Sequence, residues 1–138
     1  MDLETFDKLG PRPHIRHITG GYATVVESDS ELGYIALEYL NGRRRRYPRD
    51  RLLRDMFELP KGGLGELLFA RGALVSEWVT TAPLKLIVGA LIDMGYLAQT
   101  KDLKSLIGPL IQSMSWDRWW RSARTLVVNC PEIRQQRP

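Results

Sequence analysis

Cysteine, histidine and long apolar runs are scarce in this sequence, and each shortage excludes a class of protein. Its 138 residues include one cysteine, Cys130, and two histidines, His14 and His17. A single cysteine allows neither an internal disulfide nor a cysteine-rich metal site. The two histidines are three residues apart in a segment expected to be extended, so their side chains would point to opposite faces and make poor metal co-ligands. We therefore expect no metal and no cofactor, histidines at the surface or in turns, a buried apolar thiol at Cys130, and a reducing compartment such as the cytoplasm.

Insertion into a membrane is not expected either. The longest mostly apolar stretch, residues 82–98, contains Lys85 and Asp93 and is too short to cross a bilayer. Residues 1–4 have neither a basic start nor an apolar core, which predicts that no signal peptide is present. The composition, 43% hydrophobic and 26% charged, is that of an ordinary globular protein, and the length suits one domain or two very small ones that share a core.

The residue types needed for catalysis do not form a recognisable group. Gly62, Gly63 and Gly65 follow an expected short helix rather than a strand, and no lysine–hydroxyl pair comes after them, so they do not match a phosphate-binding loop. No nucleophile, base and orienting group can be assembled from the sequence. The prediction is a protein that is not an enzyme and has no small-molecule substrate.

A change in hydrophobic period divides the chain into two halves. Residues 14–60 have the two-residue period of strands and predict a small, strongly bent antiparallel sheet or barrel. Residues 61–131 have the three- and four-residue spacing of helices and end in a tryptophan-rich helix. Residues 1–13 are expected to be a polar lead-in, and residues 132–138 a tail. The predicted fold class is α+β, with a small barrel-like sheet followed by a helical half.

Local signals predict the turns and the helix ends. Asn41-Gly42 predicts a hairpin turn because both residues tolerate positive φ, and Gly20-Gly21 predicts a bend between strands. A short helix is expected over residues 49–57, with Leu52, Leu53 and Met56 pointing inward, and the Gly10, Pro11 and Pro13 breakers are expected to prevent a helix in residues 1–13. Hydroxyl side chains are expected to cap three later helices: Thr80 or Thr81 before Pro83, then Thr100, then Ser115.

Positive charge is gathered in two segments of the chain. The formal net charge is +4, yet residues 43–54 hold seven arginines and one acid, and residues 115–138 hold five arginines and two acids. The rest of the chain is therefore acidic. Such an asymmetry concerns binding partners rather than the fold.

The first basic segment has two interpretations. Its arginines form a charged edge strand that discourages pairing with other sheets, or they form a basic strip for phosphate oxygens or an acidic protein surface. On a strand, alternate arginines face opposite sides, so not all four of Arg43–Arg46 can be buried. The strip would comprise Arg43, Arg44, Arg45, Arg46, Arg49, Arg51 and Arg54. Tyr47 on the same strand, with Tyr34 and Tyr39 nearby, would offer aromatic contacts.

The last helix, from residue 116 to about residue 128, combines tryptophan with arginine. Trp116, Trp119 and Trp120 lie on one broad face at helical spacing, while Arg118, Arg121 and Arg124 lie around the opposite side. One interpretation is core packing behind a solvated arginine face, and the other is a binding surface, because tryptophan and arginine dominate interface hot spots. Adjacent tryptophans cannot point to the same place, so we expect one to be buried and the other to be partly exposed.

The same segment carries a resemblance to a known family. Residues 116–126, WDRWWRSARTL, followed by CPEI at 130–133, resemble a W-x-x-W-W-x-x-A-R-x-x-L…x-P-x-I signature. That signature is found in the N-terminal accessory region fused to some bacterial Gre-family transcription elongation factors. The resemblance covers about residues 14–134 and implies a Tudor-, KOW- or SH3-like barrel followed by helices. The arrangement is also similar to that of CarD-type regulators.

The sequence departs from that family at two points. Four arginines stand where the family's barrel hairpin carries a histidine and apolar residues, and no coiled coil with an acidic tip is present, so the resemblance does not imply transcript cleavage. We expect a non-enzymatic binding module associated with transcription that docks on RNA polymerase, or another nucleic-acid machine, and on a DNA or RNA backbone. The alternative is a structural or adaptor subunit of a larger complex that uses the same surfaces for protein contacts.

Overall fold

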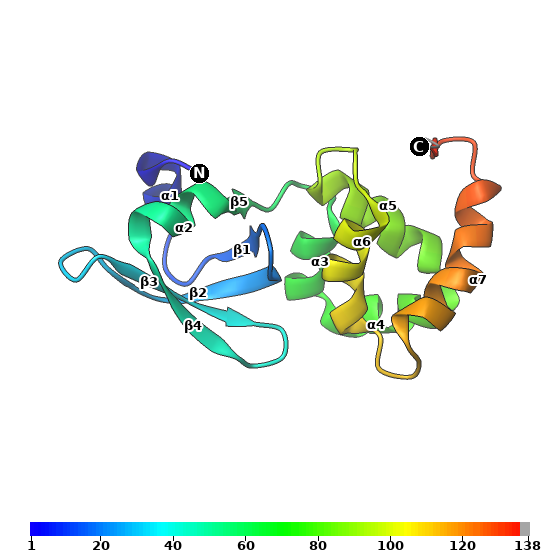
Figure 1. Cartoon of the computed structure of the whole chain (residues 1–138), viewed down its shortest axis with the longest axis horizontal. Helices are drawn as coiled ribbons and strands as arrows, with labels where there is room; N and C mark the ends of the chain where they lie inside the picture. Colours follow the sequence, from blue (N-terminus) through cyan, green and yellow to red (C-terminus); the bar gives the residue numbers. More distant parts are fainter. Residues whose placement is uncertain (136–138) are drawn as a thin grey trace.

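The computed structural model describes residues 1–135, as a sheet followed by a group of packed helices (Figure 1). Five strands form one antiparallel sheet in the order β4-β3-β2-β1-β5. They are β1 (His14–His17), β2 (Gly21–Asp29), β3 (Tyr34–Tyr39), β4 (Arg44–Pro48) and β5 (Met56–Glu58). The helical half contains α3 (Leu64–Ala70), α4 (Gly72–Thr81), α5 (Pro83–Asp93), α6 (Thr100–Ile107), the 3₁₀ turn η1 (Gly108–Leu110) and α7 (Trp116–Val128). The predicted fold class is therefore confirmed.

The sheet bends around the first of two apolar cores. Gly21 has a φ of +79° at the start of β2, which agrees with the bend predicted at the glycine pair, and the pairing of β2 with β3 shifts register between Val25 and Glu27. Such a shift bends a strand and increases its twist. The buried side chains of this core are Phe6, Ile15, Ala23, Val25, Ile35, Leu37, Leu52, Leu53 and Met56. Since β4 and β5 are each paired on one side only, both are edge strands.

The expectation that residues 1–13 form no helix is wrong. Helix α1 (Leu3–Lys8) forms because Asp2 caps it, its carboxylate accepting the Thr5 N–H at 2.7 Å, and because Phe6 is buried in the sheet core. Gly10, with a φ of +81°, lies beyond the helix and limits only its length.

The short helix after β4 is also shorter than expected. Helix α2 (Arg49–Asp55) ends where Met56 begins β5, which pairs with His17 of β1. Leu52, Leu53 and Met56 are all buried, as predicted. The pairing with β1 takes the last two residues of the expected helix into the sheet, so tertiary structure overrides the local helical pattern.

Of the three predicted hydroxyl caps, only Ser115 is confirmed, since its Oγ accepts the Arg118 N–H at 3.2 Å. The Thr80 and Thr81 hydroxyls instead donate to the Glu77 carbonyl, because α4 continues through Thr81. Thr100 is the first residue of α6, and its cap is Gln99, which forms a capping box with Asp102. Within residues 1–135, no helix combines the length and apolar character needed to cross a bilayer.

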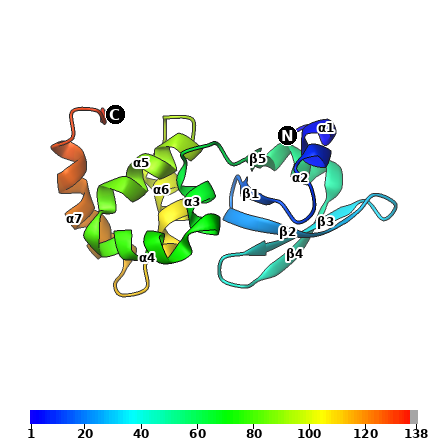
Figure 2. The same ribbon diagram turned by 180° about the vertical axis from the view of Figure 1, so that it is seen from behind.

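Side chains from β1 and β2 join the sheet to the helical half. The Tyr22 hydroxyl donates to the carboxylate of Asp93 on α5. Oδ2 of the same carboxylate also accepts the Gly65 N–H at 2.8 Å. His14 stacks on Phe69 of α3, with ring centroids 3.9 Å apart. Tyr22 belongs to the second core, which the helices enclose. The two halves therefore share packed side chains, and the ribbon seen from behind shows β1 and β2 next to α3 (Figure 2).

Two single-residue expectations need correction. His17 is buried in the sheet rather than lying at the surface, because β1 is covered on both sides by β2 and β5. Cys130 is half-buried, and its thiol donates to the Glu132 carboxylate at 3.1 Å, so it is not a buried apolar thiol.

Candidate nucleic-acid interface

The β3–β4 hairpin presents the arginine run at the edge of the sheet. The Asn41 side chain accepts the Arg43 N–H at 2.9 Å, and Gly42 has a φ of +83°. This turn reverses the chain into β4, whose second edge is unpaired. All four side chains of Arg43–Arg46 are exposed, as the alternation of a strand at an edge requires.

Two of the four arginines in the hairpin, Arg44 and Arg46, form ion pairs with acids on β3 and β2. Arg44 Nε donates to Glu38 at 3.2 Å, and Arg46 lies 3.6 Å from Glu27. The Arg46 guanidinium also lies over the Tyr34 ring, 4.4 Å from its centroid. These pairs are exposed, so each stabilises the fold by less than about 1 kcal/mol and leaves the guanidinium groups open to an incoming anion.

The β3–β4 hairpin also lines a pocket of about 600 Å³. Arg43, Arg44 and Arg45 lie at this pocket with Tyr39 and Tyr47, and the Arg45 guanidinium is 5.3 Å from the Tyr47 ring centroid. Among residues 1–135, neither Arg43 nor Arg45 takes part in an ion pair. Two unpaired guanidinium groups beside aromatic rings are the combination that binds a phosphate and an adjoining base.

The polar groups at the back of this pocket are uncharged near neutral pH. The Tyr39 hydroxyl hydrogen bonds to Tyr47 and lies 2.9 Å from His17 Nδ1. Burial lowers the pKa of His17, Asp55 opposes this shift, and Arg45 adds to it. Burial, followed by the hydrogen bond with Tyr47, raises the pKa of Tyr39. The positive charge of the pocket therefore comes from its arginines.

The three arginines of α2 have different surroundings. Arg51 and Arg54 are exposed and continue the strip beyond the end of β4. Arg49 is half-buried, lies 4.0 Å from Asp7 of α1, and has a buried Nε with no hydrogen-bond partner. Arg49 thus packs α2 against α1 and is set apart from the exposed strip.

The structure does not bring the second basic segment to the first. Helix α7 lies at the end of the molecule farthest from the sheet in both views (Figures 1 and 2). Arg118, Arg121 and Arg124 are exposed there. The predicted site residues therefore form two separate basic surfaces.

The three tryptophans of α7 divide as predicted into buried and partly exposed. Trp119 is 3% exposed, and its Nε1–H donates to the Val79 carbonyl at 2.8 Å. Trp119 therefore serves the helical core and is not available as an aromatic contact for a partner. Trp116 and Trp120 are half-buried and stack on each other with centroids 5.5 Å apart and planes 10° apart.

Sequence reasoning missed the role of His17 behind the hairpin and the group formed by Arg16, Tyr22 and Asp93 between the two halves. Only the long-range pairing of β1 with β2, and the packing of β2 on α5, brings these residues together. A polar residue, Asp93, inside an apolar helix was the one available signal.

No group of three or more acidic, histidine or cysteine side chains that could hold a metal ion occurs in the described part of the chain. Comparisons with protein-family models, with curated proteins and with solved structures found no match.

Proposed function

We propose that this chain is a non-enzymatic binding module that contacts the phosphate backbone of DNA or RNA through the β3–β4 hairpin. The resemblance of the tryptophan segment to the Gre-associated region supports a place in transcription, with RNA polymerase as the protein to which the helical half docks. The arginine strip, Arg43–Arg46 with Arg51 and Arg54, would supply the nucleic-acid contacts.

One observation carries this proposal. Arg43 and Arg45 are exposed, unpaired within residues 1–135, and held beside Tyr39 and Tyr47 by a hydrogen-bonded turn. An edge strand that served only to discourage aggregation would need charge but no aromatic pocket. The charge and the stacking surface occur together, as single-strand binding requires.

The second candidate function is a protein adaptor, and the free edge of β4 favours it. An extended peptide can add a strand to such an edge, with the arginines then meeting acidic side chains. In this case the hairpin would bind protein in place of nucleic acid.

Binding of labelled single-stranded and duplex DNA and RNA, measured by anisotropy across a salt series, tests the proposal. Each phosphate that a cation neutralises contributes roughly −0.9 to the slope of log K against log salt for duplex DNA and roughly −0.7 for single strands. The R43A/R45A variant should bind at least about tenfold more weakly at low salt. The K61A/K104A variant removes two exposed cations elsewhere and should bind like the parent chain.

Either of two results would contradict the proposal: no binding at low salt, or equal losses in R43A/R45A and K61A/K104A. A pull-down of polymerase with and without nuclease separates the two candidate functions. Retention of polymerase by R43A/R45A, together with loss of nucleic acid, supports the first, and the reverse result supports the adaptor.

A further inference from the structure

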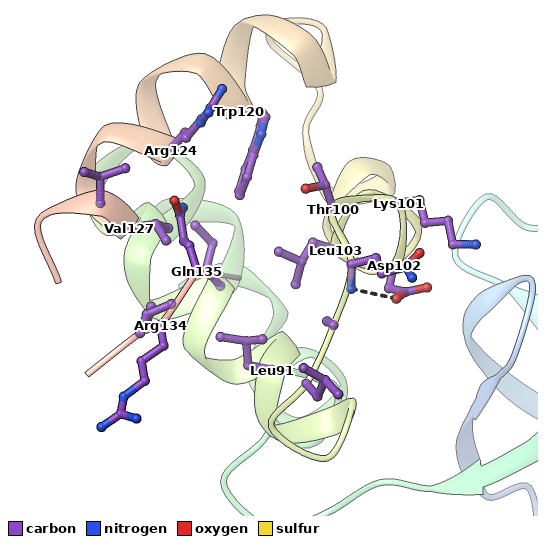
Figure 3. Close-up of a pocket in the computed structure, with 16 residues that line it drawn as sticks. Leu91, Thr100, Lys101, Asp102, Leu103, Trp120, Arg124, Val127, Arg134 and Gln135 are labelled. Carbon is purple, nitrogen blue, oxygen red and sulfur yellow. Dashed lines mark hydrogen bonds between the residues drawn. The ribbon is translucent and has the colours of Figure 1, made fainter. Parts of the chain in front are cut away.

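A groove of about 1360 Å³ lies between α7 and the start of α6, in the helical half of the molecule (Figure 3). One wall is α7, which contributes Trp120, Arg124, Val127 and Val128. These positions span nine residues, or roughly 12 Å of helix. The other wall is the loop after α5 together with the first turn of α6, and residues 133–135 lie at the mouth.

The inside of this groove is apolar. In Figure 3, Trp120 and Val127 point into the gap from α7, and Leu91 and Leu103 face them from α5 and α6. Leu97 and Val128 extend this surface to solvent, being 72% and 62% exposed. Large apolar side chains that are this exposed and line one groove are typical of an interaction surface.

The rim of the groove is positively charged. Lys101, Arg124 and Arg134 are exposed, and none of them forms an ion pair with any of residues 1–135. Among residues 1–135, the only acid lining the groove is Asp102, whose Oδ2 accepts the Gln99 N–H at 2.9 Å. The rim therefore carries a net positive charge, which favours binding to carboxylates of a partner protein.

From this combination we infer that the groove binds an acidic peptide segment of a partner protein that carries large apolar side chains on one face. An amphipathic helix of two to three turns matches the length of the α7 wall, with its apolar face on Leu97, Val128 and Trp120. Its carboxylates would meet Arg124 on the α7 wall and, at the outer edge of the opposite wall, Lys101, whose side chain extends outward from the gap in Figure 3. The inference deepens the proposed function, because it rests on the helical half being the protein-docking side, but it does not depend on nucleic-acid binding by the hairpin.

The probe is a labelled peptide of about 14 residues, roughly 21 Å as a helix, with three leucines at helical spacing on one face and glutamates on the other. Two matched peptides replace either the leucines by serine or the glutamates by glutamine. The full chain should bind the first peptide at least about tenfold more tightly than either of the other two, because both the apolar face and the charge are needed.

Two pairs of variants test the location of this binding. K101E and V128S should each weaken binding about five- to tenfold, because each removes one of the two features. K104E on α6 and L126S on α7 are the matched controls, since both residues are exposed and neither lines the groove. The controls should bind like the parent chain, and circular dichroism should show all four variants folded, as expected for substitutions of exposed residues.

Several results would overturn the inference. These are no peptide binding, equal binding of the glutamine peptide, or equal losses in K104E and K101E. A dimer of the parent chain that V128S dissociates, seen by light scattering, would assign the groove to a second copy of the chain instead. Loss of DNA binding in R43A/R45A with peptide binding retained separates the two proposals, so that either can fail alone.

Discussion

At the scale of single residues, the most constrained position is Asp93, at the contact between sheet and helices. It is 5% exposed and accepts hydrogen bonds from the Tyr22 hydroxyl and the Gly65 N–H, while its Oδ1 has no partner. Burial raises the pKa of Asp93, and the hydrogen bonds from Tyr22 and Gly65 and the positive charge of Arg16 oppose that shift. A carboxyl group whose pKa is higher in the folded state than in the unfolded state stabilises the fold most when it is protonated.

The first prediction concerns how the contribution of Asp93 to stability depends on pH. The contribution of Asp93 to the free energy of unfolding should be fully present below its unfolded pKa of about 3.9 and should fall as pH rises through its folded pKa. Asp93→Asn keeps an oxygen for both donors and removes the titration. The free energy of unfolding of the parent chain minus that of D93N, from urea melts between pH 4 and pH 7, should therefore decrease with rising pH. A difference that is flat or that grows with pH would contradict the prediction.

The second prediction concerns the close approach of Gly65 to the other half. A Cβ at this position would lie 2.6 Å from Leu59 Cδ2 and 2.7 Å from Tyr22 Cε1, and Tyr22 is 1% exposed. Gly65→Ala should therefore lower the free energy of unfolding by about 1–3 kcal/mol, as overpacking in a core does. Gly72→Ala is the control, because nothing lies within 4 Å of a Cβ there. Equal urea melts for G65A and the parent chain would show that Tyr22 moves at no cost.

At the scale of elements, hydrophobic period and turn residues predicted most of what the structure contains. The Asn41-Gly42 hairpin, the strands on both sides of it, and the Ser115 cap all depend on neighbours in the sequence, and all are present. Two errors are local, since α4 continues through Thr81 and Gln99 rather than Thr100 caps α6, and the other errors occur where a distant partner determines the structure. Phe6 stabilises α1 from the sheet core, and β1 draws Met56 into β5.

At the candidate site, too, sequence reasoning predicted what depends on neighbouring residues and missed what depends on distant ones. The sequence predicted that not all four of Arg43–Arg46 could be buried, because alternate side chains on a strand face opposite sides, and all four are exposed. It could not show that Arg49 pairs with Asp7, or that Tyr39, Tyr47 and His17 meet behind the hairpin. Those contacts depend on three-dimensional packing, the first between α1 and α2 and the others between β1, β3 and β4.

The third prediction, at the scale of an element, is that Ser115 holds the start of α7. Its Oγ accepts the Arg118 N–H, and the next turn carries Trp119 into the core. Ser115→Ala should lower the free energy of unfolding by about 1 kcal/mol, the usual effect of losing such a cap. Ser122→Ala, an exposed position inside the same helix, should leave it unchanged or slightly raise it. Chemical denaturation of both variants measures the difference, and equal effects would mean that the cap adds nothing.

At the scale of the whole molecule, the two basic surfaces lie on different halves of the structure. The hairpin arginines are on the sheet, and Arg118, Arg121 and Arg124 are on α7 (Figure 1). The contact between the halves is made by packed side chains from β1, β2, α3 and α5, which fixes this separation. We therefore expect a short nucleic acid bound at the hairpin to make no contact with α7.

The fourth prediction tests this separation through the salt dependence of binding. For a duplex of about eight base pairs, R43A/R45A should reduce the slope of log K against log salt by roughly 1.8, since each arginine accounts for about 0.9. R118A/R121A should leave the slope as it is in the parent chain, because these arginines face solvent at the far end. The two pairs remove the same charge, so a general electrostatic attraction would lower both slopes equally. An equal decrease would mean that the net charge of +4, and not the hairpin, governs binding, whereas a decrease confined to R43A/R45A places the contact on β4 and its turn.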